Sequence, residues 1–344
     1  MGAKIIRNGR NIQNKPANSA DVAALAQVSQ TTVSRVFSGK ANVKDETRRR
    51  VYEAAKTLRY RPNALAGSLN SQRSGLIALL ALDLVNPHMN MMVNKVTNRI
   101  QEMGYQTLLF LSSQEENLDT ALARVLAYRV DAIIVLSAAL SSEMGQESVG
   151  LTGRPIVVIN KFLTNSNFFS VCTDNVGTGR FVAEYLYKKG RRRFAYIGSD
   201  SVVGTSADRM KGYIEYLDER GSGRVDIEWG SYEYAGGYAA MKRILKKDTP
   251  NPDAVFCIGD LMAIGAVDCI RNEFGLRVPE DIAVVGCDNI DSSAWKTYRL
   301  TTLEQNIDEM IDEAMLYLKG SLEGKSVEGG YKLFPCRLIE RDTV

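Results

Sequence analysis

The sequence is poor in the residues that most catalytic sites require. Its 344 residues include a single histidine, His88, and the phosphate-binding pattern G-x-x-x-x-G-K-[ST] is absent. A histidine-based zinc site or a histidine-activated nucleophile would need His88 each time, and no cysteine or acid lies near it at metal-ligand spacing. We therefore expect a protein that is not an enzyme and that uses no cofactor.

Long apolar runs are also absent, and cysteine is scarce. The longest apolar run, LIALLAL from Leu76, is far too short to span a bilayer. Five cysteines are scattered along the chain with neither a disulfide pattern nor a metal-ligand spacing. This usage is typical of reduced core thiols, so we expect a cytoplasmic protein with no membrane partner.

The stretch from Asn18 to Leu69 has the pattern of a DNA-reading module. Asn18 and Asp21 have the spacing of a capping box, which predicts the start of a first helix. Gln27-Val28 predicts a break after this helix, and Ser29 predicts the cap of a second helix. A third helix is expected over residues 45–58. Two short helices joined by a tight turn form a helix-turn-helix. The polar side of the second helix offers side chains suited to base edges and phosphates: Gln30, Thr31, Thr32 and Arg35.

Charge divides the chain in the same way. Residues 1–75 hold 14 Lys/Arg and 4 Asp/Glu, a net charge of +10, so residues 76–344 hold the remaining 29 and 36, a net charge of −7. A compact basic module is the electrostatic signature of phosphate binding. The basic residues 1–17 carry no acid and no apolar core, and we expect a disordered tail there.

From Leu76 onward, short apolar strands alternate with amphipathic helices. LIALLAL, YQTLLFL, DAIIVLS and PIVVI form a first series, and RFAYIG, Val225 to Trp229, DAVFCIG and DIAVVGC form a second. This alternation predicts an α/β fold with parallel sheets covered on both faces. Two similar series predict two lobes, with a ligand cleft at the carboxyl ends of the strands.

The stretch DVAALAQVSQTTVSRVFSGKANVKDETRRRVYEAAKTLRYRPNALAGSL resembles the lactose/galactose repressor family (LacI/GalR), and the similarity continues at lower identity to residue 344. Two residues depart from the family pattern: Gln27 stands where Gly is usual in the turn, and Lys44 where Ser is usual at the third helix. The resemblance implies a DNA interface that comprises Asn18, Ser29, Gln30, Thr31, Arg35, Tyr60, Asn63, Ala66 and Leu69.

The resemblance also implies a core similar to periplasmic binding proteins, in which the chain crosses between the lobes three times. We expect a tail at 1–17, a helix-turn-helix head at 18–61, and a hinge helix with its linker at 62–75. The first lobe would comprise 76–174 and 303–332, and the second 175–302 and 333–344.

In that family the cleft between the lobes binds a small effector. Arg209 matches the residue that grips ligand hydroxyls or carboxylates, and Asp288 matches the acid opposite it. Weaker matches add His88, Met89, Asn160, Thr205, Tyr232 and Asp260. The residue types leave the effector open among a sugar, a sugar phosphate and a nucleobase.

The segment RPNALAGSLNSQRSG predicts a helix of about two turns after Pro62, too short to be stable alone in water. The resemblance implies a hinge helix whose Leu69 wedges between base pairs.

We therefore predict a homodimeric DNA-binding transcription regulator, expected to be a repressor, whose operator affinity is switched by a small-molecule effector. The alternative is a sugar-binding or sugar-processing protein without a regulatory role.

Overall fold

The computed structural model describes residues 17–37, 43–61, 73–81, 84, 86–111, 118–136, 153–160, 169–199 and 204–344. The chain divides into two compact units, Met1–Ser74 and Gly75–Val344. We call the described part of the first unit the head and the second unit the core.

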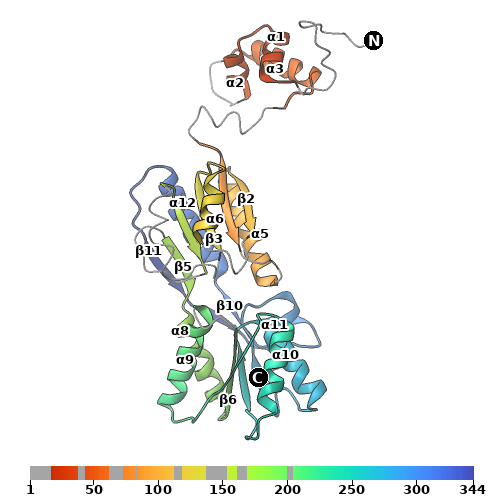
Figure 1. The fold of residues 1–344 in the computed structure, drawn as a ribbon, viewed down its shortest axis with the longest axis vertical. Helices are drawn as coiled ribbons and strands as arrows, with labels where there is room; N and C mark the ends of the chain where they lie inside the picture. Colours follow the sequence, from red (N-terminus) through yellow and green to blue (C-terminus); the bar gives the residue numbers. More distant parts are fainter. Residues whose placement is uncertain are drawn as a thin grey trace. The chain divides into compact units, whose positions relative to one another are not determined.

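The head is a small bundle of helices (Figure 1). Its elements are α1 (Ser19–Ala26), α2 (Gln30–Phe37) and α3 (Asp45–Thr57). All three contribute to one apolar cluster, in which Val22, Val33 and Val51 are buried almost completely. The predicted helix-turn-helix is confirmed. Leu25, however, lies outside this core and is 46% exposed, because its position on α1 faces solvent.

Local hydrogen bonds explain where the head helices begin. Asn18 and Asp21 form the predicted capping box, and Thr32 N donates to Ser29 Oγ at 3.1 Å. Gln27 adopts the left-handed conformation with φ 52°, as the missing glycine predicts. Lys44 precedes α3 without a side-chain hydrogen bond to its first turn.

The first lobe of the core is a parallel six-stranded sheet in the order β11-β5-β4-β3-β1-β2. Its strands are β1 (Leu76–Ala81), β2 (Gln106–Leu111), β3 (Ala132–Leu136), β4 (Ile156–Ile159), β5 (Phe169–Thr173) and β11 (Gly330–Phe334). Its helices are α5 (Pro87–Glu102), α6 (Leu118–Leu126) and α12 (Ile307–Leu322). Successive side chains of β1 face opposite sides of the sheet: Ile77 and Leu79 join the cluster with α5 and α12, and Ala78 and Leu80 join the cluster with α6.

The second lobe is a parallel four-stranded sheet in the order β7-β6-β8-β9. Its strands are β6 (Phe194–Ser199), β7 (Asp226–Gly230), β8 (Ala254–Cys257) and β9 (Ala283–Val285). Its helices are α8 (Asn175–Lys188), α9 (Thr205–Glu219), α10 (Tyr234–Leu245) and α11 (Asp260–Asp268), followed by the π-helical turn η1 (Cys269–Glu273) and the 3-10 turn η2 (Asp291–Ala294). Figure 1 shows α8 and α9 together on one side of the sheet and α10 and α11 on the other.

Close packing fixes α9 against α8. A Cβ atom at Gly212 would lie 1.9 Å from the carbonyl oxygen of Val176, and one at Gly179 would lie 1.9 Å from that of Arg209. The two helices can approach this closely only because both contact positions lack a side chain. The backbone that carries Arg209 is therefore held rigidly beside the start of α8.

Three segments connect the lobes: β5 to α8, β10 (Thr302–Gln305) to α12, and β11 to β12 (Cys336–Ile339). β10 and β12 pair antiparallel in a sheet of their own. Leu303 packs in the apolar cluster of the second lobe, and β11 continues to Phe334 in the first-lobe sheet. These elements thus change lobe a few residues beyond the expected boundaries at 303 and 332.

The predicted fold class is confirmed, and eight of the strands lie in the predicted runs. Strands β5, β10 and β11 were not predicted. The sequence of β5, FSVCT, is short and contains two polar residues. The five cysteines are free, and all except the half-buried Cys336 are buried. Among the described residues, no helix combines the length and apolar character needed to cross a bilayer.

Candidate functional site

Helix α2 presents a polar face to solvent. Val33 and Val36 are buried against the head core, which leaves Gln30, Thr31 and Arg35 exposed on the outside of the helix. The sequence predicted these three as base-reading side chains, and an exposed helix face of this kind suits the major groove.

Hydrogen bonds orient several of these side chains. Ser29 Oγ lies 2.7 Å from Thr31 Oγ1, so the cap of α2 also holds the Thr31 hydroxyl. Gln30 Nε2 donates to Ser19 Oγ at 2.7 Å. Sequence reasoning missed Ser19, because no spacing rule connects the first residue of α1 to the first residue of α2.

The other predicted DNA contacts differ in their surroundings. Asn18 uses its side-chain oxygen to accept hydrogen bonds from Ala20 N and Asp21 N, so it caps α1. Tyr60 is half-buried, with its ring 5.8 Å from that of Phe37. The predicted contacts Asn63, Ala66 and Leu69 lie outside the described residues.

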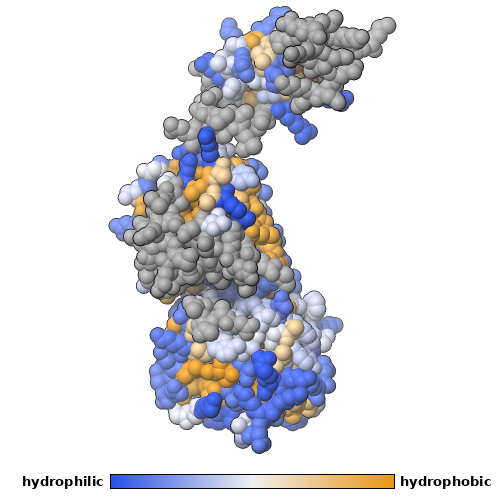
Figure 2. All heavy atoms as spheres, in the orientation of Figure 1, coloured by the Kyte–Doolittle hydropathy of each residue, from blue (hydrophilic) through white to orange (hydrophobic). Residues whose placement is uncertain are grey.

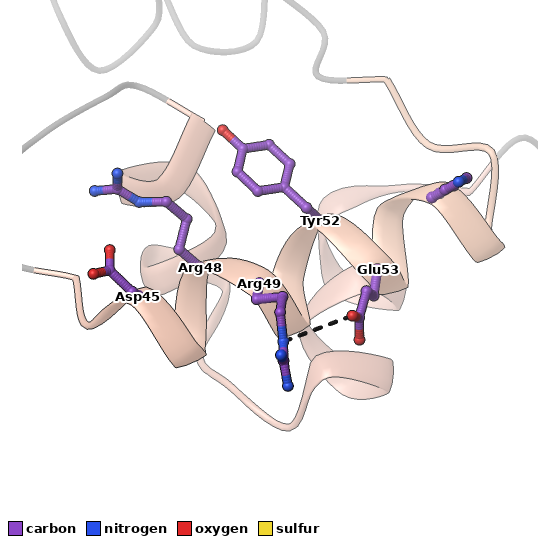
Figure 3. Close-up of a pocket in the computed structure, with 6 residues that line it drawn as sticks. Asp45, Arg48, Arg49, Tyr52 and Glu53 are labelled. Carbon is purple, nitrogen blue, oxygen red and sulfur yellow. Dashed lines mark ion pairs between the residues drawn. The ribbon is translucent and has the colours of Figure 1, made fainter.

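A shallow hollow lies along the outer face of α3 (Figure 3). Its lining residues all come from this one helix: Asp45, Arg48, Arg49, Tyr52, Glu53 and Lys56. Arg49 and Glu53 form an ion pair at 3.8 Å with both side chains largely exposed. Because one helix alone cannot enclose a small molecule, we read this hollow as a solvated surface.

Arg209 is the centre of a polar cluster in the core. Its side chain is 1% exposed, with Nε donating to Asn175 Oδ1 at 2.9 Å and Nη1 donating to Ile258 O at 2.7 Å. Tyr232 donates from its hydroxyl to the same carbonyl at 2.9 Å. Arg209, from α9, and Tyr232, which precedes α10, thus meet at the end of β8.

Asp288 joins this cluster to the other lobe. Gln305 Nε2 donates to Asp288 Oδ1 at 2.7 Å, and Thr173 Oγ1 donates to Gln305 Oε1 at 2.7 Å. His88, at the start of α5 in the first lobe, places Nδ1 3.8 Å from Asp288 Oδ1. Asp288 has φ 119°, a conformation that L-residues rarely adopt and that is often found at functional sites.

Burial and charge set the protonation of these groups. Burial lowers the pKa of His88 to about 4, with help from the positive charge of Arg209, so its imidazole is neutral at neutral pH. Burial raises the pKa of Asp288 to about 7, although Arg209 and the hydrogen bond from Gln305 oppose that rise. At 3.8 Å the contact between His88 and Asp288 is therefore neither a hydrogen bond nor a full ion pair.

Asp260 has a different environment from Asp288. Its carboxylate accepts hydrogen bonds from Thr302 Oγ1 and from Ile290 N, the latter at 2.9 Å. These bonds hold β10 and the segment after Asp288 against the start of α11. Burial, together with the charge of Asp288, raises the pKa of Asp260 to about 7. Asp260 thus supports the cluster through the backbone around it.

The remaining predicted effector residues lie at varied distances from this network. Met89 packs in the apolar core of the first lobe. Asn160, after β4, has φ 65° and a buried Oδ1 that finds no hydrogen-bond partner among the residues that the structure describes. Thr205 is the half-buried first residue of α9, one turn before Arg209.

Sequence reasoning missed Gln305, Asn175 and Thr173, although they connect the predicted residues to one another. Each is a buried polar residue at a strand or helix end. Only Thr173 ends a strand of a parallel sheet, where the carboxyl ends of the strands meet at one edge, so only Thr173 had a signal in the sequence.

The fold and these sites define a class of protein: a helix-turn-helix DNA-binding regulator with a two-lobed core. Residues 20–63 match the family of bacterial regulatory proteins called the lacI family, and residues 183–344 match the periplasmic binding protein-like domain. The chain is 33% identical to the HTH-type transcriptional repressor PurR of Proteus mirabilis, over 95% of this chain and 97% of that protein. It is 30% identical to the repressor CytR of Escherichia coli, over 96% of each.

The chain therefore belongs to the LacI family of transcription regulators. Solved structures of transcription regulators have a similar fold. The Lac repressor dimer bound to operator and the anti-inducer ONPF has a TM-score of 0.84 and 25% identity, over 96% of this chain and 99% of that one. The complex of the regulator CelR with cellobiose has a TM-score of 0.70 and 29% identity, over 95% and 100%.

Proposed function

We propose that the chain is a homodimeric repressor that binds operator DNA through its head and a small-molecule effector between the lobes of its core. The observation that carries the effector site is the contact of His88 with two residues from outside its own lobe segment: its Nδ1 lies 3.8 Å from Asp288 Oδ1, and its Nε2 lies 3.4 Å from Gln305 Nε2. A ligand bound there would contact both lobes at once, so its affinity would depend on the position of one lobe relative to the other.

Two buried polar atoms support this placement. Within the described part of the chain, His88 Nδ1 and Asn160 Oδ1 have no hydrogen-bond partner, and burying such an atom without one costs about 1–3 kcal/mol. A ligand with hydroxyl, amino or ring N–H groups would satisfy them. Arg209 and Asp288 would then hold the ligand from the second lobe. A sugar, a sugar phosphate or a nucleobase carries such groups, and the related CelR was solved with cellobiose.

On the DNA side, Gln30, Thr31 and Arg35 would read base edges while other head cations contact phosphates. By resemblance, Asn63, Ala66 and Leu69 would act from the hinge helix, with Leu69 as the wedge. The similar Lac repressor dimer was solved bound to operator, which supports an operator-binding role for this chain.

Dimerisation is supported by the edge of the first-lobe sheet. β2 is an edge strand on which Leu109 and Leu111 are 41% and 50% exposed. Figure 2 shows apolar residues gathered on the visible surface of the first lobe, on the side where Figure 1 draws α5 and β2. An apolar surface of this kind is typical of a protein interface.

We further propose a cytoplasmic, non-enzymatic protein. The relatives named above are transcriptional repressors. The buried polar side chains of the cluster hydrogen-bond mainly to one another, and Asp288, His88 and Arg209 are not arranged as a nucleophile and its base.

A thermal-shift screen of sugars, sugar phosphates, nucleobases and nucleosides tests the effector site. A ligand at 100 times its Kd should add about 2.7 kcal/mol to the free energy of unfolding. The shift should disappear in Arg209→Lys and in Asp288→Asn and persist in Lys211→Ala, an exposed change on the same helix. A ligand that shifts all three variants equally would place the site elsewhere.

A gel shift with an operator selected from random DNA then tests regulation. The ligand found in the screen should change the operator affinity of the parent protein and leave that of Asp288→Asn unaltered. If the ligand binds but operator affinity never changes, the alternative of a ligand-binding protein without a regulatory role is favoured.

A further inference from the structure

Three of the five cysteines lie around the buried guanidinium of Arg209. Asn175, which holds Arg209 Nε, also donates from Nδ2 to Cys172 Sγ at 3.5 Å. Thr178 Oγ1 lies 3.4 Å from Cys336 Sγ, and Cys336 packs against the apolar cluster that contains Cys287. Cys287 and Cys336 are thus neighbours although 49 positions separate them in the sequence.

This thiol pair connects two parts of the polar cluster. Cys287 directly precedes Asp288. Cys336 begins β12, just after the chain crosses from β11, and stands opposite Gln305 in the β10–β12 pair. Since Gln305 donates to Asp288, both thiols adjoin residues of the proposed effector site.

The two thiols differ in access and in charge. Cys287 is fully buried, whereas Cys336 is half-buried. The hydrogen bond from Cys287 lowers the pKa of the Cys336 thiol, and the charge of Arg209 acts in the same direction against burial. The same hydrogen bond and burial raise the pKa of Cys287. Cys336 is therefore the thiol that ionises first and that a small reagent reaches first.

We propose that Cys287 and Cys336 form a peroxide-reactive dithiol site, in which Cys336 is the attacking thiol and Cys287 the resolving one. The Cys336 thiolate attacks one oxygen of the peroxide, the O–O bond breaks, and Cys336 becomes a sulfenic acid. The hydroxide that leaves takes up the proton that the Cys336 thiol released when it ionised, which gives water. Cys287 then attacks the Cys336 sulfur, the S–O bond breaks, a disulfide forms, and a second water leaves. The two thiols lose two electrons and the peroxide gains them.

The disulfide would tie the end of β9 to the start of β12. It would restrain the third connection between the lobes and displace the contact of Cys336 with Thr178. Any effect on operator affinity rests on the proposed effector function. The thiol chemistry itself does not, because it needs no effector and no DNA.

Peptide mass spectrometry of the full-length protein tests the proposal. The protein is treated with hydrogen peroxide, its free thiols are blocked with N-ethylmaleimide under denaturing conditions, and it is digested with trypsin. Peptides 278–296 and 333–337 carry Cys287 and Cys336 respectively. We expect them to appear joined, lighter than their sum by two hydrogen atoms, and separable by dithiothreitol.

Single variants assign the roles. Cys336→Ser should abolish the joined peptide and leave Cys287 unmodified, whereas Cys287→Ser should let Cys336 progress to sulfinic acid. Cys269→Ser, a change in η1, is the matched control and should form the same disulfide as the parent. If a variant does not fold, brief N-ethylmaleimide labelling of the native parent replaces it: Cys336 should react about tenfold faster than Cys172 or Cys287.

Two outcomes would overturn the proposal. One is that peroxide leaves both thiols fully open to blocking at concentrations that oxidise exposed methionines. The other is that Cys336 in the native protein labels no faster than Cys172. Neither result bears on the ligand screen, so failure of the dithiol site and failure of the effector site are distinguishable.

Discussion

Arginine has opposite surroundings in the two units. In the head, Arg35 and Arg49 are exposed on helices, where a cation can meet phosphate without losing its water beforehand. In the core, Arg209 is withdrawn from water and its charge is met by Asn175, a backbone carbonyl and Asp288. The head thus keeps its charges available to a large polyanion. The core instead uses a buried charge to hold α9 against the start of α8 and the end of β8.

The largest difference between the units should appear when an arginine is removed. Arg209→Ala leaves the buried side-chain oxygen of Asn175 without its donor and empties the space of a fully buried side chain, which together should cost about 2–5 kcal/mol. Arg35→Ala removes an exposed cation, which should change the free energy of unfolding by less than about 0.5 kcal/mol. Urea unfolding measures both. The comparison fails if the two variants lose equal stability.

The pH dependence of core stability should follow from its buried acids. Burial raises the folded-state pKa of Asp288 from 3.8 to about 7, so the folded state binds a proton that the unfolded state has released. Stability from this group is present below pH 4 and is lost as pH rises to 7, on the order of 2–4 kcal/mol. His88 acts oppositely: its pKa falls from 6.5 to about 4, so it adds stability as pH rises across that range.

The variant Asp288→Asn separates the contribution of Asp288 to the pH dependence of stability from that of His88. The Tm of the variant minus that of the parent should increase between pH 5 and 8, because only the parent must ionise Asp288, whereas both proteins contain Asp260. Asp291→Asn, an exposed acid in η2, is the control and should give a constant difference. A constant difference for Asp288→Asn as well would mean that Asp288 ionises freely in the folded state.

In the head, substitutions should change DNA binding and leave stability nearly unchanged, in contrast to substitutions in the core cluster. Replacing Gln30 and Thr31 with Ala should alter the preferred half-site by about 1–3 kcal/mol per lost base contact, while stability stays near that of the parent. Lys56→Ala, which removes one head cation, should instead weaken all DNA sequences by one factor. Selection from random DNA measures both. An unchanged preference in the double variant would remove α2 from base reading.

The head could be predicted from sequence in more detail than the core, for a physical reason. The capping box at Asn18, the break at Gln27 and the cap at Ser29 are contacts between residues two to four positions apart, so spacing alone reveals them. The core cluster joins Thr173, Gln305 and Asp288, which are far apart in the sequence and meet only when the strands are paired. Periodicity finds strands, but it does not show which strand ends meet.

The family resemblance predicted Arg209 and Asp288 where periodicity could not, and in the structure the charge of Arg209 acts on Asp288. It did not reveal that Asp260 is held by Thr302 and Ile290, or that Met89 packs in an apolar core. Those facts depend on side-chain direction at each position. Similarly, the cysteines predicted as reduced core thiols include a half-buried one, Cys336, which is the first residue of β12.

The smallest effect should come from the start of α3. Lys44 occupies the cap position with no side-chain hydrogen bond to the first turn, so Lys44→Ser should supply the missing acceptor for a backbone N–H. We expect the head to gain about 1 kcal/mol, measured by hydrogen exchange of the α3 amides in the full chain, while the Tm of the core stays constant. Ser29→Ala is the converse control, because Ser29 Oγ already accepts from Thr32 N and its loss should destabilise α2 by a similar amount. Protection that rises equally in α3 and in the core sheets would show that the two units do not unfold separately, and the contrast between an independent head and core would then be lost.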